Sequence, residues 1–197
     1  MKSPNDEELR KVRAELEDWL PPHEFARKVE ALDRRIKSCE RFNSAKFKFL
    51  RDDAWVLLAQ FARLMKADSV RLVRRQTEGD ADDGYVKISR QCLKIQITEA
   101  DRPSRERGKE YRPNASTFTD EQINNAEYVA RALRGPIQKK IEKHYAPPPP
   151  TLVVNLNLGV HGSQEQETKL ASLIAEIKEQ YRPNFARIYV LRDDRLF

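Results

Sequence analysis

The sequence predicts an α/β fold in which helices flank a mixed sheet and an N-terminal helical hairpin precedes it. Three observations predict this fold. Between residues 69 and 98, strand-like runs follow one another with only turns between them, which is typical of a meander. After residue 119, helical and strand-like segments alternate, which indicates parallel strands joined by crossover helices. Before residue 43, the apolar spacing is helical on both sides of Pro21-Pro22.

Two N-terminal helices are predicted on either side of these prolines. Ser3-Pro4-Asn5-Asp6 is typical of a helix start, and Pro21-Pro22 ends the helix that follows. Its apolar stripe consists of Leu9, Val12, Leu16, Trp19 and Leu20. The stripe of the second helix has the spacing of a coiled-coil seam and consists of Phe25, Val29, Leu32, Ile36 and Cys39. We expect an antiparallel hairpin packed on the main domain, with a homo-oligomer formed through these helices as the alternative.

A third helix and three strands are predicted next. The helix runs from Asn43 to about Lys66, and its buried face carries Phe47, Leu50, Ala54, Leu57, Leu58, Phe61 and Leu64. The three strands are Ser69–Arg75, Tyr85–Ile88 and Leu93–Thr98. A polar turn joins the last two, so we expect them to pair as antiparallel neighbours.

The rest of the chain alternates helices with strands. Two capping boxes open its helices: Thr119 with Gln122, and Ser163 with Gln166. The strands are Thr151–Leu158 and Phe185–Leu191. Gly135-Pro136 is expected to kink or divide the first of these helices. Pro147–Pro150 forms a stiff connector to the strand that follows it.

Composition favours a polyanionic partner and gives no sign of export. The formal net charge is +6, and 35% of the residues are charged. Cys39 and Cys92 both fall on apolar positions, so they are predicted to be small core residues, with no disulfide or zinc site. No signal peptide or membrane-spanning stretch is visible, so the sequence predicts a cytoplasmic protein without a membrane partner.

The chemically suggestive stretch runs from Asp82 to Asp101. Alternation places Lys94, Gln96 and Thr98 on one face of their strand and Leu93, Ile95 and Ile97 on the other. Asp82 and Asp83 open the neighbouring strand, and carboxylate and amide oxygens on adjacent strands suit a hard cation such as Mg²⁺. The predicted ligands are Asp83 and Gln96, assisted by Asp82 or by Glu99. Glu99 has the wrong parity unless a bulge or the strand end turns it inward.

Structural alternatives exist for each of these features. Asp82-Asp83-Gly84 is also an ordinary turn signature, and Gln96 can be a solvated or hydrogen-bonded strand residue. The polar loop that follows has the composition of a phosphate-contacting segment, and equally that of a solvated loop. Its basic residues are Arg102, Arg105, Arg107, Lys109 and Arg112.

Over about residues 44–197, this order of elements and motifs resembles the PD-(D/E)XK nuclease-like superfamily, which has the restriction-endonuclease-like fold. Asp82-Asp83-Gly84 falls where that family has its first acid. Gln96-Ile97-Thr98-Glu99 looks like a family variant in which Thr replaces the motif Lys. The later segments 137–145 and 152–156 also resemble the helix and strand that follow in such members. The resemblance implies an arm over residues 1–43, a nuclease-like domain over residues 44–197, and Mg²⁺-dependent phosphodiester hydrolysis on DNA or RNA.

The sequence departs from the family pattern at two positions. Gln96 replaces the second acid and carries no charge, so it would hold a cation more weakly. Thr98 replaces the Lys, whose role would pass to Lys94, or to Lys139 or Lys140 approaching from the helix. The candidate catalytic residues are Asp83, Gln96, Lys94 and Thr98. Two functions stay open: a divergent metal-dependent nuclease, and a catalytically inactive binding or scaffold module with the same fold.

Overall fold

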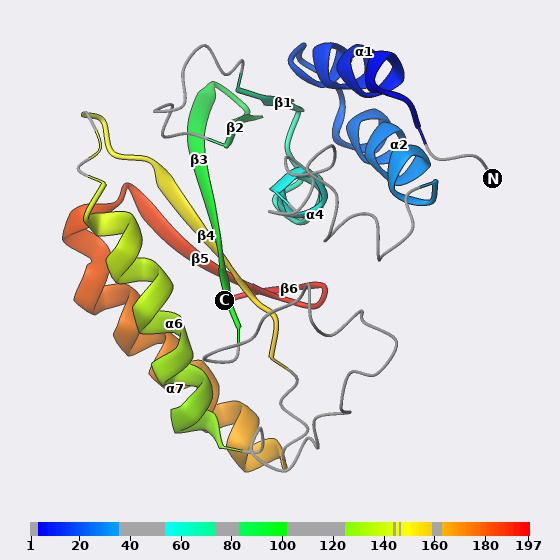
Figure 1. Ribbon diagram of the computed structural model, residues 1–197. Coiled ribbons are helices and arrows are strands. Elements are labelled where there is room, and N and C mark those ends of the chain that lie inside the picture. The colour runs from blue at the N-terminus through cyan, green and yellow to red at the C-terminus, as the bar shows by residue number, and fades with distance from the viewer. Residues whose placement is uncertain are drawn as a thin grey trace. The chain divides into compact units, whose positions relative to one another are not determined.

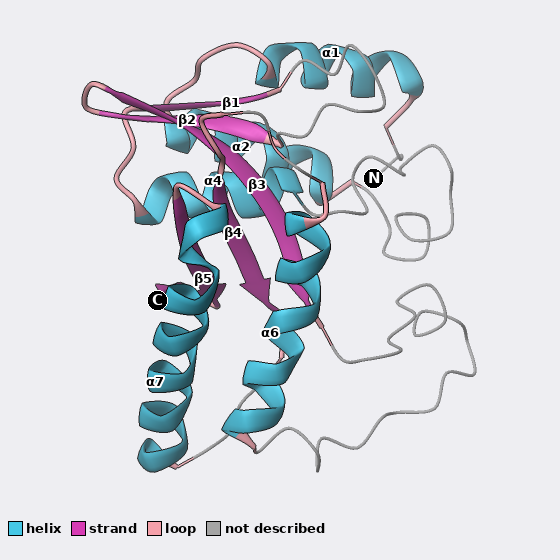
Figure 2. Cartoon of the chain, turned by 90° about the vertical axis from the view of Figure 1, so that its left-hand side faces the viewer, coloured by secondary structure: helices cyan, strands magenta, loops and turns pink. Residues whose placement is uncertain are grey.

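The computed structural model describes residues 4–35, 54–73, 83–101, 125–143, 145, 147–158 and 163–197. Its contacts divide the chain into two compact units (Figure 1, Figure 2). The first unit comprises Met1–Ile95 with Glu106–Ala115, and the second comprises Gln96–Arg105 with Ser116–Phe197. The two units are therefore described separately.

The strands form a mixed sheet, which confirms the predicted α/β class. They pair in the order β1 (Ser69–Leu72), β2 (Gly84–Ile88), β3 (Gln91–Ala100), β4 (Thr151–Leu156), β5 (Arg187–Arg192) and β6 (Arg195–Leu196). The pairs β1–β2 and β2–β3 are antiparallel, as the predicted meander requires, and β4–β5 is parallel, as the crossover through the intervening helix requires. The two-residue strand β6 turns back on β5 and was not predicted.

The described helices are α1 (Asp6–Leu16), α2 (Pro22–Asp33), α4 (Ala54–Leu64), α6 (Ala126–Ile141) and α7 (Gln164–Tyr181), with a short 3₁₀ turn at Arg182–Asn184. One predicted boundary was wrong, and of two alternatives at Gly135-Pro136 one is excluded. The first helix ends at Leu16, before Pro21-Pro22, so Trp19 and Leu20 lie outside it. Pro136 lies inside α6, which therefore continues through Gly135-Pro136 without division.

In the first unit, the N-terminal helices pack within the chain. Phe25, Val29 and Leu32 of α2 are buried, and α2 contacts α4. Lys28 of α2 binds the Glu15 carboxylate of α1 at 2.7 Å. Beyond α1, the backbone of Leu20 exchanges two hydrogen bonds with Val70 of β1, at 2.8 and 3.0 Å. The arm therefore buries its apolar stripe against α4 and caps the edge of β1.

In the second unit, α6 and α7 lie side by side along one face of β4 and β5 (Figure 1). The buried stripe of α6 follows helical spacing and consists of Ala126, Val129, Ala130, Leu133 and Ile137. It packs with Leu170, Ile174 and Ile177 of α7 in a single apolar cluster. Alternate residues of the strands complete this cluster: Ala100, Leu152, Val154, Leu156, Ile188 and Val190. The side chains of β3 and β4 with the opposite parity therefore point away from the helices.

The second predicted capping box has formed in part. The Ser163 hydroxyl accepts a hydrogen bond from the Gln166 backbone N–H at 3.4 Å. The Gln166 side chain, however, accepts from the backbone N–H of Ala126, at the start of α6. It therefore links the two helices and does not complete the reciprocal half of the box. The other predicted box, Thr119 with Gln122, lies outside the described residues.

Gly84 is required by packing and does not form a turn. It is the first residue of β2, and its φ is not positive. A Cβ at this position would collide with the buried Leu58 side chain of α4 and would lie 2.8 Å from the Arg71 carbonyl oxygen. The missing side chain therefore allows α4 to approach the sheet closely.

Replacement by alanine is expected to have opposite effects on stability at Gly84 and at Gly135. Gly84→Ala should lower the free energy of unfolding by about 1–3 kcal/mol, because overpacking against backbone cannot relax cheaply. Gly135→Ala in α6 is the matched control, because a Cβ there meets no atom within 4 Å. It should raise stability by up to about 1 kcal/mol through helix propensity. Urea denaturation of both variants measures these changes, and destabilisation by Gly135→Ala that equals that of Gly84→Ala would contradict the packing argument.

Acid should weaken the contact between α1 and α2. The hydrogen bond from Lys28 lowers the pKa of Glu15 below its usual value. Because the folded-state pKa is the lower one, the contact stabilises the protein above the unfolded-state pKa and is lost as the pH falls through the folded-state value. The effect is small, since the Glu15 side chain is 38% exposed. Glu15→Gln should flatten the acid limb of Tm measured from about pH 7 to about pH 3, and an unchanged limb would exclude this contribution.

Candidate functional site

Gln96 is the best-defined of the predicted site residues. It lies in β3, is 1% exposed, and belongs to the second unit. Its Oε1 accepts hydrogen bonds from Lys140 Nζ at 2.7 Å and from the Tyr145 hydroxyl at 3.2 Å. Lys140 lies in the last turn of α6, as expected for a lysine that approaches from the helix, whereas Lys139 is exposed. The structure thus brings Gln96 and Lys140 together and leaves Gln96 buried and hydrogen-bonded.

These contacts do not suit a cation at the amide. An oxygen that accepts from an ammonium group 2.7 Å away is a poor ligand for Mg²⁺, because the two positive charges would repel each other at close range. Thr98 lies two residues further along β3 and is partly buried. The contact with Lys140 therefore argues against a metal ion at Gln96 Oε1 while this hydrogen bond is made.

Glu99 lies on the opposite face of β3. Its Oε1 accepts a hydrogen bond from Asn155 Nδ2 of β4 at 3.3 Å. The parity of Asn155 is that of the β4 residues pointing away from α6 and α7. Gln96 instead meets the end of α6, so the sequence expectation of opposite parity is confirmed and no bulge turns Glu99 inward. Gln96 and Glu99 therefore have different partners on opposite faces of β3, and a metal ion shared by them stays a prediction.

The other predicted ligands are placed differently. Asp83 belongs to the first unit, where its backbone N–H donates to the Ile95 carbonyl at 2.8 Å and continues the β2–β3 ladder. Asp82 lies outside the described residues, as does the basic loop with Arg102, Arg105, Arg107, Lys109 and Arg112. A metal ion shared by Asp83 and Gln96, and phosphate contacts from that loop, stay predictions.

The prediction for Cys92 was wrong. Its side chain is exposed on β3, where the register places it opposite Lys87. Cys92 therefore shares the parity of the polar residues of this strand and not that of Leu93. Cys39 lies outside the described residues.

A second candidate site, which the sequence did not reveal, lies in the first unit. We call it the cationic aromatic face, and it consists of Trp19, Arg71, Tyr85, Lys87 and Lys94. Register places Arg71 of β1 opposite Tyr85 of β2, and Tyr85 opposite Lys94 of β3. Four residues of the opposite parity, Val70, Leu72, Val86 and Ile95, are buried. The five side chains of the face are each partly exposed.

Close cation–ring contacts hold this face together. The Arg71 guanidinium carbon lies 4.8 Å from the centroid of Trp19 and 5.0 Å from that of Tyr85. Lys87 Nζ lies 4.1 Å from the Trp19 ring. The two rings are 6.5 Å apart at an interplanar angle of 53°. Trp19 reaches the sheet because Leu20, the next residue, pairs with Val70 of β1.

The stretch of sequence that carries three residues of this face is basic. The segment Gly84–Thr98 contains Lys87, Arg90 and Lys94 and no acidic residue. Arg90 is exposed in the turn between β2 and β3. Cations interleaved with aromatic rings on a sheet surface are the combination with which proteins contact phosphates and bases. The sequence signal was the acid-free run itself, but the positions of Trp19 and Arg71 could not be read from it.

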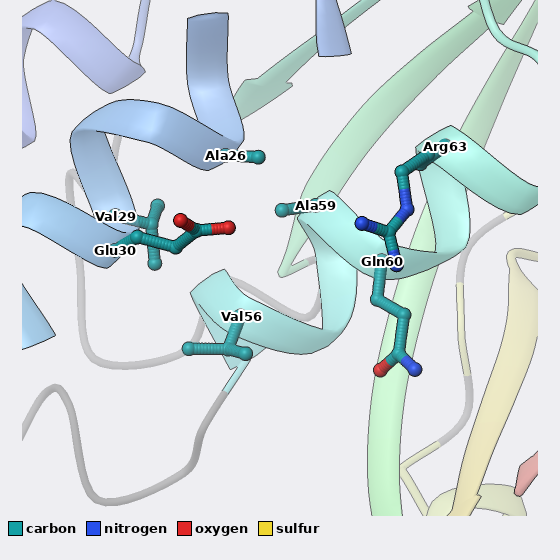
Figure 3. Close-up of a pocket in the computed structure, with 7 residues that line it drawn as sticks. All are labelled: Ala26, Val29, Glu30, Val56, Ala59, Gln60 and Arg63. Carbon is teal, nitrogen blue, oxygen red and sulfur yellow. The ribbon is translucent and has the colours of Figure 1, made fainter. Parts of the chain in front are cut away.

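A groove between α2 and α4 is the third feature of interest (Figure 3). Its volume is about 270 Å³, and Ala26, Val29, Val56 and Ala59 supply apolar lining. Glu30, Gln60 and Arg63 add polar groups (Figure 3). Val56 is 37% exposed, more than any other large apolar residue in the described part of the chain.

Comparison with protein-family models, with curated proteins and with solved structures finds no match for this chain. Within the described ranges, no three His, Cys, Asp or Glu side chains are grouped so that they could hold a metal ion. No helix in the described part of the chain has both the length and the apolar character needed to cross a bilayer.

The Gln96 contacts predict how divalent ions should behave. Gln96→Leu should leave a calorimetric Mn²⁺ titration unchanged, because the amide oxygen is already bonded to Lys140. Asp83→Ala is the comparison, since Asp83 is the other predicted ligand. Weaker Mn²⁺ binding in both variants would support a metal ion bound by both residues. Weaker binding in Asp83→Ala alone would exclude Gln96 from the metal site.

Proposed function

We propose that the protein is a nucleic-acid-binding module that acts without metal chemistry at Gln96. The observation that carries this proposal is the cationic aromatic face of the first unit. It combines three cations with two aromatic rings on one surface of β1, β2 and β3. Of the two functions that the sequence left open, this corresponds to the non-catalytic one.

Charge and chemistry both support this ligand class. The chain carries a net charge of +6, and Tyr85, Lys87 and Lys94 of the face lie in a segment, Gly84–Thr98, whose charged residues are all basic. Lysine and arginine bind phosphates and displace their counterions, which supplies most sequence-independent affinity for nucleic acids. Trp19 and Tyr85 add ring surfaces on which a base can stack, a feature with no use for a simple inorganic polyanion.

The contacts at Gln96 support binding over hydrolysis. Nuclease chemistry of the kind implied by the family resemblance needs an acidic ligand and a metal ion at this strand. Here a neutral amide is engaged by Lys140 and Tyr145. The restriction-endonuclease-like arrangement itself stays part of this proposal, since the mixed sheet alone is common to many functions.

Salt dependence of nucleic-acid binding tests the proposal. Fluorescence anisotropy with labelled single-stranded and duplex oligonucleotides should give an affinity that falls steeply with salt. The double variant Lys87→Gln/Lys94→Gln should flatten the log–log slope by about 1.4 for single strands or about 1.8 for duplexes, which corresponds to two lost phosphate contacts. Trp19→Leu should instead weaken binding by about 1–3 kcal/mol with little change of slope.

Lys139→Gln/Lys143→Gln is the matched control, because it removes the same charge from exposed lysines of the second unit. An equal change of slope in both double variants would show that binding follows net charge and not this face. Arg105→Ala/Arg107→Ala tests the basic loop in the same assay, and a slope change confined to that variant would move the binding site to the loop. Cleavage of the oligonucleotide with Mg²⁺ present would contradict the non-catalytic proposal.

A further inference from the structure

The Gln96 amide group has a donor that no residue in the described part of the chain satisfies. Its Oε1 accepts two hydrogen bonds, but its Nε2 is buried and has no hydrogen-bond partner. Buried polar groups in folded proteins are rarely left unpaired, because they give up bonds to water without replacement. Such an exception calls for a physical explanation.

The orientation of this amide follows from chemistry. The Lys140 ammonium has only donor hydrogens, so the amide must present its oxygen to it. Turning the amide over would set the NH₂ group against the ammonium and lose the bond from Lys140. The Nε2 hydrogens can therefore be satisfied only by an acceptor from outside these three residues.

The neighbouring groups favour a negatively charged acceptor. Gln96 is itself neutral and meets two donors, one of which is the Lys140 ammonium 2.7 Å away. The Tyr145 ring packs 6.1 Å from that of Phe185, which gives the site an apolar wall. In a partly desolvated setting, bonds from an ammonium and an amide to an anionic oxygen are stronger than those to a neutral one.

We propose that Gln96, Lys140 and Tyr145 form a binding site for a phosphate group. The two Nε2 hydrogens and the Lys140 ammonium provide donors for more than one oxygen of the same ligand, which suits a phosphate. Nε2 is covered in this structure, whereas Lys140 and Tyr145 are partly exposed. The phosphate therefore reaches the amide when one of these two side chains moves aside. This site lies in the second unit and does not depend on the cationic aromatic face.

The Gln96 side-chain NH₂ resonances report on this site directly. In ¹⁵N-labelled protein they are identified by their loss in Gln96→Glu, and the titrant is inorganic phosphate. We expect a saturable shift of these resonances in the wild type and an apparent Kd about tenfold higher in Lys140→Met. Lys139→Met, which removes an exposed charge from the adjacent position, should leave the Kd unchanged. Equal weakening in both lysine variants would overturn the proposal, since it would show diffuse charge attraction.

Gln96→Glu keeps the shape of the side chain and its contact with Lys140 but replaces the donor with an acceptor. It should abolish the phosphate-induced rise in Tm, and a rise equal to that of the wild type would overturn the site. Gln96 NH₂ resonances that do not shift with phosphate and that show exchange with a bound water would also overturn the proposed site.

Titration with a short oligonucleotide separates the two sources of the phosphate group. A Gln96 response to inorganic phosphate alone identifies a small-molecule site, and a response that survives Lys87→Gln/Lys94→Gln with the oligonucleotide identifies phosphodiester contact. Failure of the oligonucleotide to bind the cationic aromatic face would refute the proposed function and leave this site standing.

Discussion

In a β-strand, alternate side chains point to opposite faces, and the chemistry of this protein depends on how β3 obeys that constraint. Gln96 meets the end of α6, whereas Glu99 turns to the other side and bonds to Asn155. Closer to its start, the same strand presents Lys94 opposite Tyr85, on the face away from the buried Val86 and Ile95. The pleat therefore divides one polar sequence among surfaces with different roles. A metal site that used both Gln96 and Glu99 would require a break in the alternation of side chains along β3.

Burial changes which partners the Gln96 amide can bind. On a solvated strand, an amide would be an ordinary polar residue, and beside carboxylates it would be a weak metal ligand. Packed beneath Lys140 and Tyr145, it becomes an acceptor for two donors and leaves its own donor without a partner. A carboxylate in its place would pair with Lys140 as an ion pair and leave no such donor. The neutral amide is therefore what leaves a donor for the proposed phosphate.

The cationic aromatic face depends on tertiary contacts of a different kind. Trp19 comes from the segment between two helices, and it reaches the sheet because the backbone of Leu20 pairs with the edge of β1. The Trp19 ring then makes cation–π contacts with both Arg71 and Lys87, two cations on adjacent strands that would otherwise repel each other. The same pairing covers the exposed edge of β1, so a single short contact both protects the sheet and builds the surface.

The sequence by itself determined the element types and their order, because periodicity, capping residues and prolines act over a few neighbouring positions. The helical stripes of α2 and α6, the Ser163 cap and the meander were all readable in this way. It also predicted that Lys139 or Lys140 could approach this strand from the helix, and Lys140 contacts Gln96 there. Tertiary structure alone decided that Gly84 is a packing residue, that Cys92 is exposed, and that Trp19 lies against Arg71. These outcomes depend on which faces meet across distant segments, and local patterns carry no information about a partner that lies tens of residues away.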